Sequence, residues 1–112
     1  MNEPYANPEP PEFDEDRARQ IIGKRVLVGV TYRDRDSHEV LRLEQFHGVV
    51  ARASRKGWIV VRWSDDTERS IPPDLSKLEP AASGNYRLKS TGEIVVDPDY
   101  LSVWTVYPKK DP

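Results

Sequence analysis

The side chains that could carry out chemistry are few, and their spacing fits no catalytic arrangement. The histidines His38 and His47 lie nine residues apart, and the chain has no cysteine, so the paired ligands of a zinc site are missing. The stretch "DRDSHE" (34–39) brings Asp, Ser and His together, but a catalytic triad needs a rigid scaffold and an oxyanion site. We therefore predict no enzyme activity, no metal and no cofactor.

The paired carboxylates have a structural explanation. Asp65 and Asp66, like Asp97 and Asp99, fall in predicted turns, where acids are common because they accept hydrogen bonds from nearby backbone amides. No glycine-rich phosphate loop is present. These observations favour a protein that acts by binding.

Charge is unevenly distributed along the 112 residues. Residues 1–16 contain six acids and no Lys or Arg, whereas the rest of the chain contains 17 basic and 13 acidic residues. An acidic segment on a mildly basic body could compete with nucleic acid for the basic face, or could simply add solubility. The absence of cysteine, of a signal peptide and of an apolar run long enough for a membrane span predicts a cytoplasmic protein that does not contact membranes.

The elements that would position a site are short and mostly extended. Residues 1–13 are acidic and rich in proline, which predicts disorder, and residues 14–23 predict a short helix that stops at Gly23. Alternating or apolar runs predict strands, and Gly48 is a candidate bulge or bend. The strand candidates are residues 24–32, 40–54, 58–63, 67–71, 78–80 and 101–107, with a hairpin over 86–96 that turns at Thr91-Gly92.

The stretch from "GKRVLVGV" through "KGWIVVRWSDDTERSIP" to "LEP", residues 24–80, resembles the SH3-like barrels of the Tudor, KOW and Agenet kind. The resemblance implies a mostly β fold, a small antiparallel barrel with a short N-terminal helix. Residues 81–108 fall outside the resemblance. We expect them to form an extra C-terminal hairpin and strand that either extend the sheet or pack on one open end of the barrel. Such barrels have many functions, so the resemblance predicts fold better than function.

Tudor-like barrels that bind methylated Lys or Arg hold the cation in an aromatic cage beside an acid. The resemblance places Tyr32, Phe46, Trp63 and Asp65 near the cage positions. The alternative is that these aromatic residues belong to the core. Trp58 and Trp63 are five positions apart on one strand and so point to opposite faces; we expect Trp58 in the core and Trp63 on a binding surface.

Nucleic-acid binding is the alternative function. Basic residues gather around the predicted strands at 40–71, and an Arg face beside an aromatic side chain could hold phosphate and stack a base. The basic residues are interspersed with acids, and the isoelectric point is near 5.7, which is low for a dedicated nucleic-acid binder. The basic candidates are Arg52, Arg55, Lys56, Arg62 and Arg69.

A non-catalytic module for protein–protein recognition fits best, for example an immunity-type inhibitor as found in bacteria or an accessory subunit of a complex. Mixed charge and exposed aromatic residues suit a specific protein partner. The sequence leaves the partner and the oligomeric state open, and the long second strand could pair along its edge with another chain. The predicted partner surface comprises Tyr32, Phe46, Arg62, Trp63, Asp65, Asp66 and Arg69.

Overall fold

The N-terminal helix forms where the sequence predicts it. The computed structural model describes residues 14–109, so the predicted disorder of residues 1–13 lies outside it. Helix α1 spans Glu15–Ile21, and the Asp14 side chain accepts a hydrogen bond from the Arg17 amide at its start. Ala18 and Ile21 are buried and hold the helix on the sheet. After it, Gly23 takes a left-handed φ of 83°, a conformation that favours glycine.

The remainder of the described chain is mostly extended, which confirms the mostly β fold class. The elements in chain order are β1 (Arg25–Arg33), β2 (Val40–Ser54), β3 (Gly57–Arg62), β4 (Glu68–Ile71), the 3₁₀ turn η1 (Leu75–Lys77), β5 (Leu78–Pro80), β6 (Asn85–Arg87), β7 (Ile94–Val96) and β8 (Tyr100–Val106). The predicted 86–96 hairpin is present as the β6–β7 pair, and Gly92 takes a left-handed φ of 77° in its turn.

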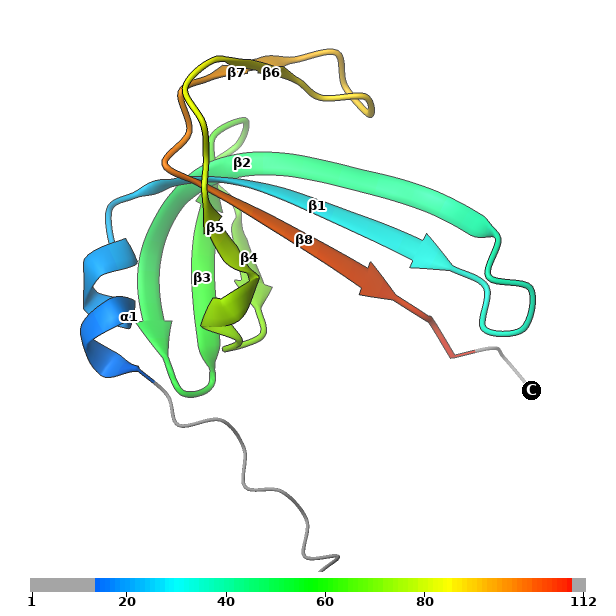
Figure 1. Cartoon of the computed structure of the whole chain (residues 1–112), viewed down its shortest axis with the longest axis horizontal. Coiled ribbons are helices and arrows are strands. Elements are labelled where there is room, and N and C mark those ends of the chain that lie inside the picture. The colour runs from blue at the N-terminus through cyan, green and yellow to red at the C-terminus, as the bar shows by residue number, and fades with distance from the viewer. Residues whose placement is uncertain (1–13, 110–112) are drawn as a thin grey trace, which may run out of the picture.

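Six strands form one curled sheet in the order β4-β3-β2-β1-β8-β5, and β6 and β7 form a separate hairpin (Figure 1). Neighbouring strands are antiparallel except β1 and β8, which are parallel. The pairing ends at β4 on one side and β5 on the other, and no ladder joins these two edges. The strand pairing therefore does not confirm the expected closed barrel.

Strand β8 lies inside the sheet, between β1 and β5. Of the two expected arrangements for residues 81–108, this strand therefore extends the sheet rather than packing on the outside of a barrel formed by residues 24–80. It pairs with β1 over seven residues, from Tyr100 beside Val26 to Val106 beside Tyr32. Strand β5 has three residues and ends at Pro80, and it reaches only the start of β8. The longer β8 satisfies more of the backbone hydrogen bonds along β1 than β5 could, and it separates the two.

The strands β1, β2 and β8 continue beyond the rest of the sheet as a three-stranded arm, seen at the right of Figure 1. The other strands and α1 enclose the core at the opposite end. Alternate residues of β1 face this core, and Val26, Val28 and Val30 are buried. Trp58 from β3 is fully buried among them, which confirms its predicted core position.

Candidate functional site

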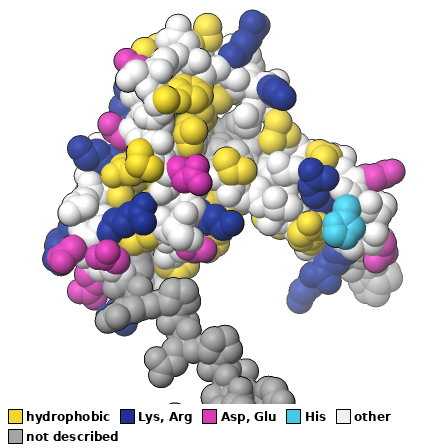
Figure 2. All heavy atoms as spheres, viewed as in Figure 1, with side chains coloured by type: hydrophobic (Ala, Val, Ile, Leu, Met, Phe, Trp, Pro, Cys, Tyr) yellow, Lys and Arg dark blue, Asp and Glu magenta, His cyan; other side chains and the backbone are white. Residues whose placement is uncertain are grey.

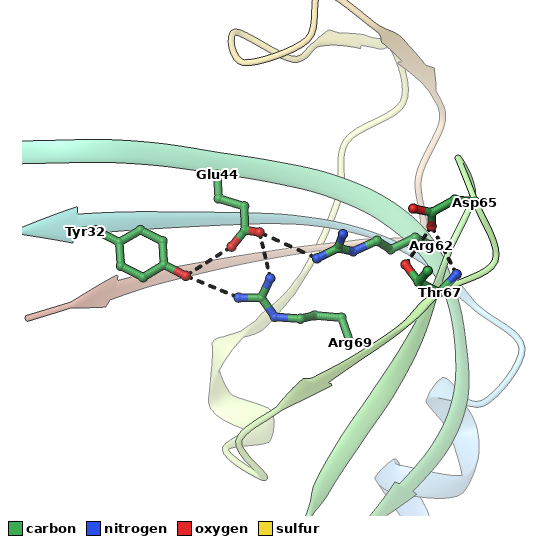
Figure 3. A network of polar contacts seen from close by, with 6 residues as sticks. All are labelled: Tyr32, Glu44, Arg62, Asp65, Thr67 and Arg69. Atoms are coloured by element: carbon green, nitrogen blue, oxygen red, sulfur yellow. Dashed lines mark hydrogen bonds and ion pairs between the residues drawn. The ribbon is translucent and has the colours of Figure 1, made fainter. Parts of the chain in front are cut away.

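Three of the predicted binding residues, Tyr32, Arg62 and Arg69, meet around a glutamate on the core-facing side of the sheet (Figure 3). Glu44 Oε2 accepts a hydrogen bond from Arg69 Nη1 at 2.7 Å and lies 3.5 Å from Arg62 Nη2. The Tyr32 hydroxyl donates to Glu44 Oε1 at 3.1 Å and accepts from Arg69 Nη2 at 3.3 Å. We call Tyr32, Glu44, Arg62 and Arg69 the Glu44 network.

Elements that are distant in the sequence bring this network together. Tyr32 comes from β1, Glu44 from β2, Arg62 from β3 and Arg69 from β4. On β2, Glu44 and Phe46 point to the same face because strand side chains alternate. The guanidinium groups of Arg62 and Arg69 reach Glu44 across the concave side of the curled sheet. Their attraction to the Glu44 carboxylate favours the curled shape of the sheet.

Arginines of the same chain occupy the aromatic faces that a cage would offer to a ligand. The guanidinium carbons of Arg62 and Arg69 lie 5.1 and 5.2 Å from the centre of the Phe46 ring. That of Arg42 lies 3.9 Å from the centre of the Tyr32 ring. These are cation–π distances. Tyr32 and Phe46 thus already have cationic partners within the fold.

The network shifts the acidity of its members. The hydrogen bond from Arg69 is the main cause that lowers the pKa of Glu44, with the charges of Arg69 and Arg62 and the Tyr32 hydrogen bond acting in the same direction against burial. The hydrogen bond to Glu44 in turn raises the pKa of Arg69. Both shifts favour the ionised forms of Glu44 and Arg69, as expected for a hydrogen-bonded ion pair.

Asp65 and Asp66 lie apart from the network and shape the turn between β3 and β4. Asp65 Oδ1 accepts hydrogen bonds from the Thr67 amide at 3.0 Å and from its hydroxyl at 2.6 Å, and the hydroxyl bond is the main cause that lowers the pKa of Asp65. Asp66 takes a left-handed φ of 58°, which turns tolerate in Asp. The geometry assigns both residues a turn-forming role.

Trp63 is also separate from the Glu44 network. Its side chain is 66% exposed, in agreement with the predicted surface position. Its amide donates to the His47 carbonyl at 2.9 Å, and its ring stacks on that of His47 with 6.2 Å between centres. The expected grouping of Trp63 with Tyr32 and Phe46 is wrong, because Trp63 accompanies His47 on the opposite face of β2.

That opposite face of the arm is low in charge. The strand register sets three rows across it, each with one residue from β2, β1 and β8. We call these nine residues the outer face: His47, Leu27 and Leu101; Gln45, Gly29 and Val103; Leu43, Thr31 and Thr105. The set contains no Asp, Glu, Lys or Arg, although 32% of the chain is charged.

The outer face is accessible at its far end and at its centre. Val103 is 65% exposed and Leu43 is 37% exposed. A Cβ added at Gly29 would meet no atom within 4 Å, so the middle of the face is open. The β6–β7 hairpin covers the other end: the Ser90 amide donates to the Gln45 side chain at 3.1 Å, and Glu93 lies 3.0 Å from His47 Nε2. Figure 2 shows the arm and the hairpin as separate lobes with a re-entrant surface between them.

Sequence reasoning missed both Glu44 and the outer face. Glu44 was detectable as an acid two positions from Phe46 in a predicted strand, in a chain whose later strands carry Arg62 and Arg69. Most of the outer face was not detectable, because Val103 joins it only through the parallel β1–β8 pairing.

Among residues 14–109, no group of three or more His, Cys, Asp or Glu side chains could hold a metal ion. No helix in the same range is long and apolar enough to cross a membrane.

A surface hollow of about 400 Å³ lies where α1 meets the β2–β3 turn. It contains none of the predicted site residues, and Arg55 at its rim is paired with Glu15 at 3.4 Å. Its lining residues are Glu15, Ala18, Arg19, Ala53, Ser54, Arg55 and Lys56.

Comparison with known proteins gives no family for the chain. No protein-family model, curated protein or solved structure matches it.

Proposed function

We propose that this chain is a non-catalytic module that binds another protein through the outer face of its arm. The single observation that supports this most is the absence of charged Asp, Glu, Lys and Arg from nine adjacent positions of a chain that is 32% charged. The centres of protein interfaces are depleted of charge and enriched in apolar and aromatic side chains. An immunity-type inhibitor or an accessory subunit would both use such a face.

The shape of the surface supports a specific partner. Val103 and Leu43 provide apolar contact area at the centre and far end of the outer face, and the exposed Trp63 stacks on His47 at its other end. Exposed tryptophan is the residue type most enriched at binding hot spots. The open position above Gly29 would accept one protruding side chain of the partner.

Nucleic-acid binding, the alternative, has weaker support. Four of its five candidate basic residues are already paired with glutamates: Arg52 with Glu68, Arg55 with Glu15, and both Arg62 and Arg69 with Glu44. Each carboxylate would compete with a phosphate for its arginine. Nucleic-acid affinity depends on unpaired Lys and Arg side chains that neutralise phosphates and release their counterions.

Affinity capture from the native cell lysate tests the proposal. The wild-type chain should retain a dominant protein partner with and without nuclease, and Val103→Lys should lose it because it places a charge at the centre of the contact. Ile94→Lys is the matched control: Ile94 is 57% exposed on the β6–β7 hairpin and lies outside the outer face, so it should retain the partner.

The result that would overturn the proposal is retention by Val103→Lys equal to that by Ile94→Lys, with both variants folded by circular dichroism. Loss of the partner on nuclease treatment would instead favour the nucleic-acid alternative. That alternative also requires binding to short single-stranded oligonucleotides that weakens steeply with salt.

A further inference from the structure

We infer that two copies of this chain pair through the free edge of β2 in an antiparallel, two-fold symmetric dimer centred on Leu43. The edge in question is the side of β2 opposite β1, from Leu41 to Phe46. Strand β3 pairs with β2 only from Gly48 onward, and the Trp63 amide bonds to the His47 carbonyl just before it. Among residues 14–109, no strand pairs with the edge before that point.

Two apolar side chains of this edge are exposed: Leu41 is 57% exposed and Leu43 is 37% exposed. Lysine and proline, which often protect free edges, do not occur between Leu41 and Phe46, and the two charged residues there, Arg42 and Glu44, have opposite signs. The free length is bounded at one end by Trp63 and at the other by the irregularity in the β1–β2 register at Leu41, so any partner strand must be short.

The backbone fixes which residues could bond to a partner strand. The amide and carbonyl of one residue in a strand point to the same side, and the side alternates along the strand. Val50 bonds toward β1, through Lys24 and Gly23, whereas His47 bonds toward Trp63. The β1–β2 ladder is regular between His47 and Leu43, so every second residue in this stretch bonds to the same side as His47. The amides and carbonyls of Gln45 and Leu43 therefore point to the free edge.

Charge then selects the register. A dimer centred on Arg42 would put Arg42 opposite its own copy, and one centred on Glu44 would put two glutamates together. Like charges directly opposite destabilise a strand pair. A centre at Leu43 instead places Arg42 opposite Glu44 of the second copy, twice by symmetry, and brings the two Leu43 side chains together. It also makes Leu43 a hydrogen-bonded pair with its copy, which agrees with the backbone direction derived above.

The consequence is a sheet that continues from the arm of one copy into the arm of the other. Both outer faces would lie on the same side of this sheet, because residues opposite each other across a strand pair share a face. The dimer does not require a third protein.

Cross-linking through single cysteines tests the register, since the chain has no native cysteine. In the proposed dimer the two copies of residue 43 are about 5.5 Å apart at Cα, within the range of a disulfide. Leu43→Cys should therefore form a disulfide dimer under mild oxidation. Leu41→Cys is the control on the same exposed stretch: its two copies would be separated by at least about 13 Å along the strand and should not cross-link.

Sedimentation equilibrium tests the dimer itself. The wild-type chain should be a dimer, and Arg42→Glu should raise the dissociation constant by about tenfold or more because it creates two like-charge pairs. Arg42→Gln removes only the attraction and should have a smaller effect. A wild-type chain that is monomeric at the highest soluble concentration, or equal cross-linking of Leu41→Cys and Leu43→Cys, would overturn the inference.

Discussion

Glu44 on β2 accepts a hydrogen bond from Arg69 on β4 at 2.7 Å, although β3 separates these two strands in the sheet. The contact crosses the concave side of the curled sheet and ties the base of the arm to the β4 edge. Both side chains are about three-quarters buried, with 23% and 26% exposed. The pair is therefore less screened by water than the surface pairs of this chain.

Glu44→Gln should destabilise the fold by about 1–2 kcal/mol. The substitution preserves size but leaves Arg62 and Arg69, whose side chains are both about three-quarters buried, without their counter-charge. Urea denaturation at one low protein concentration measures the change in the free energy of unfolding. Glu68→Gln is the matched control, because its partner Arg52 is 61% exposed and water screens this pair, so its loss should cost clearly less. Equal losses in the two variants would contradict a special role for the Glu44 network.

The stability that Glu44 contributes should depend on pH. Its pKa is lowered in the folded state, chiefly by the Arg69 hydrogen bond. A group whose folded pKa is depressed stabilises the fold above its unfolded pKa, and this contribution is lost as pH falls through the folded value. The difference in unfolding free energy between wild type and Glu44→Gln should thus be largest near neutral pH and shrink in the acid range. A difference that stays constant or grows as pH falls would rule out this linkage.

Much of the fold follows from local sequence patterns, because strand alternation and turn residues act over a few positions. The alternation of Val26, Val28 and Val30 located β1 and its buried face, and the five-residue spacing of the tryptophans separated Trp58 from Trp63 correctly. The short helix at Asp14–Gly23 and the β6–β7 hairpin were predicted for the same reason.

The pairing of distant strands could not be derived in this way. Nothing near Leu101 or Val103 indicates that β8 lies parallel to β1 rather than on top of the sheet. Part of the site was missed because it depends on this pairing, and the cage was misjudged because side-chain alternation alone does not show that Trp63 faces away from Tyr32 and Phe46. Arg62 and Arg69 were placed with those aromatic residues, but their common partner Glu44 was not recognised.

The two tryptophans of the β3 strand region should respond oppositely to truncation. Trp58 is fully buried, so Trp58→Ala should cost about 3–5 kcal/mol through lost burial and a cavity. Trp63 is 66% exposed, so Trp63→Ala should change stability by less than about 0.5 kcal/mol. Urea denaturation followed by circular dichroism measures both without relying on the removed fluorophore. A large loss in Trp63→Ala would show that the ring supports the fold through His47.

Trp58→Phe provides a finer test of the core. The indole Nε1 of Trp58 is buried and has no hydrogen-bond partner among the described residues. Phenylalanine removes this unpaired donor along with part of the ring, and an unpaired buried donor is itself destabilising. Trp58→Phe should accordingly lower the free energy of unfolding by less than half as much as Trp58→Ala in the same urea titration. A cost equal to that of Trp58→Ala would indicate that the indole N–H has a partner in solution.

Gly48 on β2 and Gly29 on β1 should tolerate alanine very differently. A Cβ at Gly48 would lie 2.0 Å from the Val61 carbonyl oxygen, a backbone atom that cannot move aside without disturbing β3, whereas a Cβ at Gly29 would meet nothing within 4 Å. Gly48→Ala should thus cost at least about 2 kcal/mol. Gly29→Ala should be neutral or stabilise by about 0.5 kcal/mol, because glycine weakens a strand interior.

Comparison of the two urea midpoints, at equal slopes, decides the prediction. Both variants add one methyl group to a strand residue, so intrinsic β propensity contributes similarly to each and the difference reports the contact with β3. Similar midpoints for Gly48→Ala and Gly29→Ala would mean that β2 and β3 lie farther apart at Gly48. In that case β3 would also hold Arg62 farther from Glu44 on β2. The Glu44→Gln variant should then lose only as much unfolding free energy as the exposed-pair control Glu68→Gln.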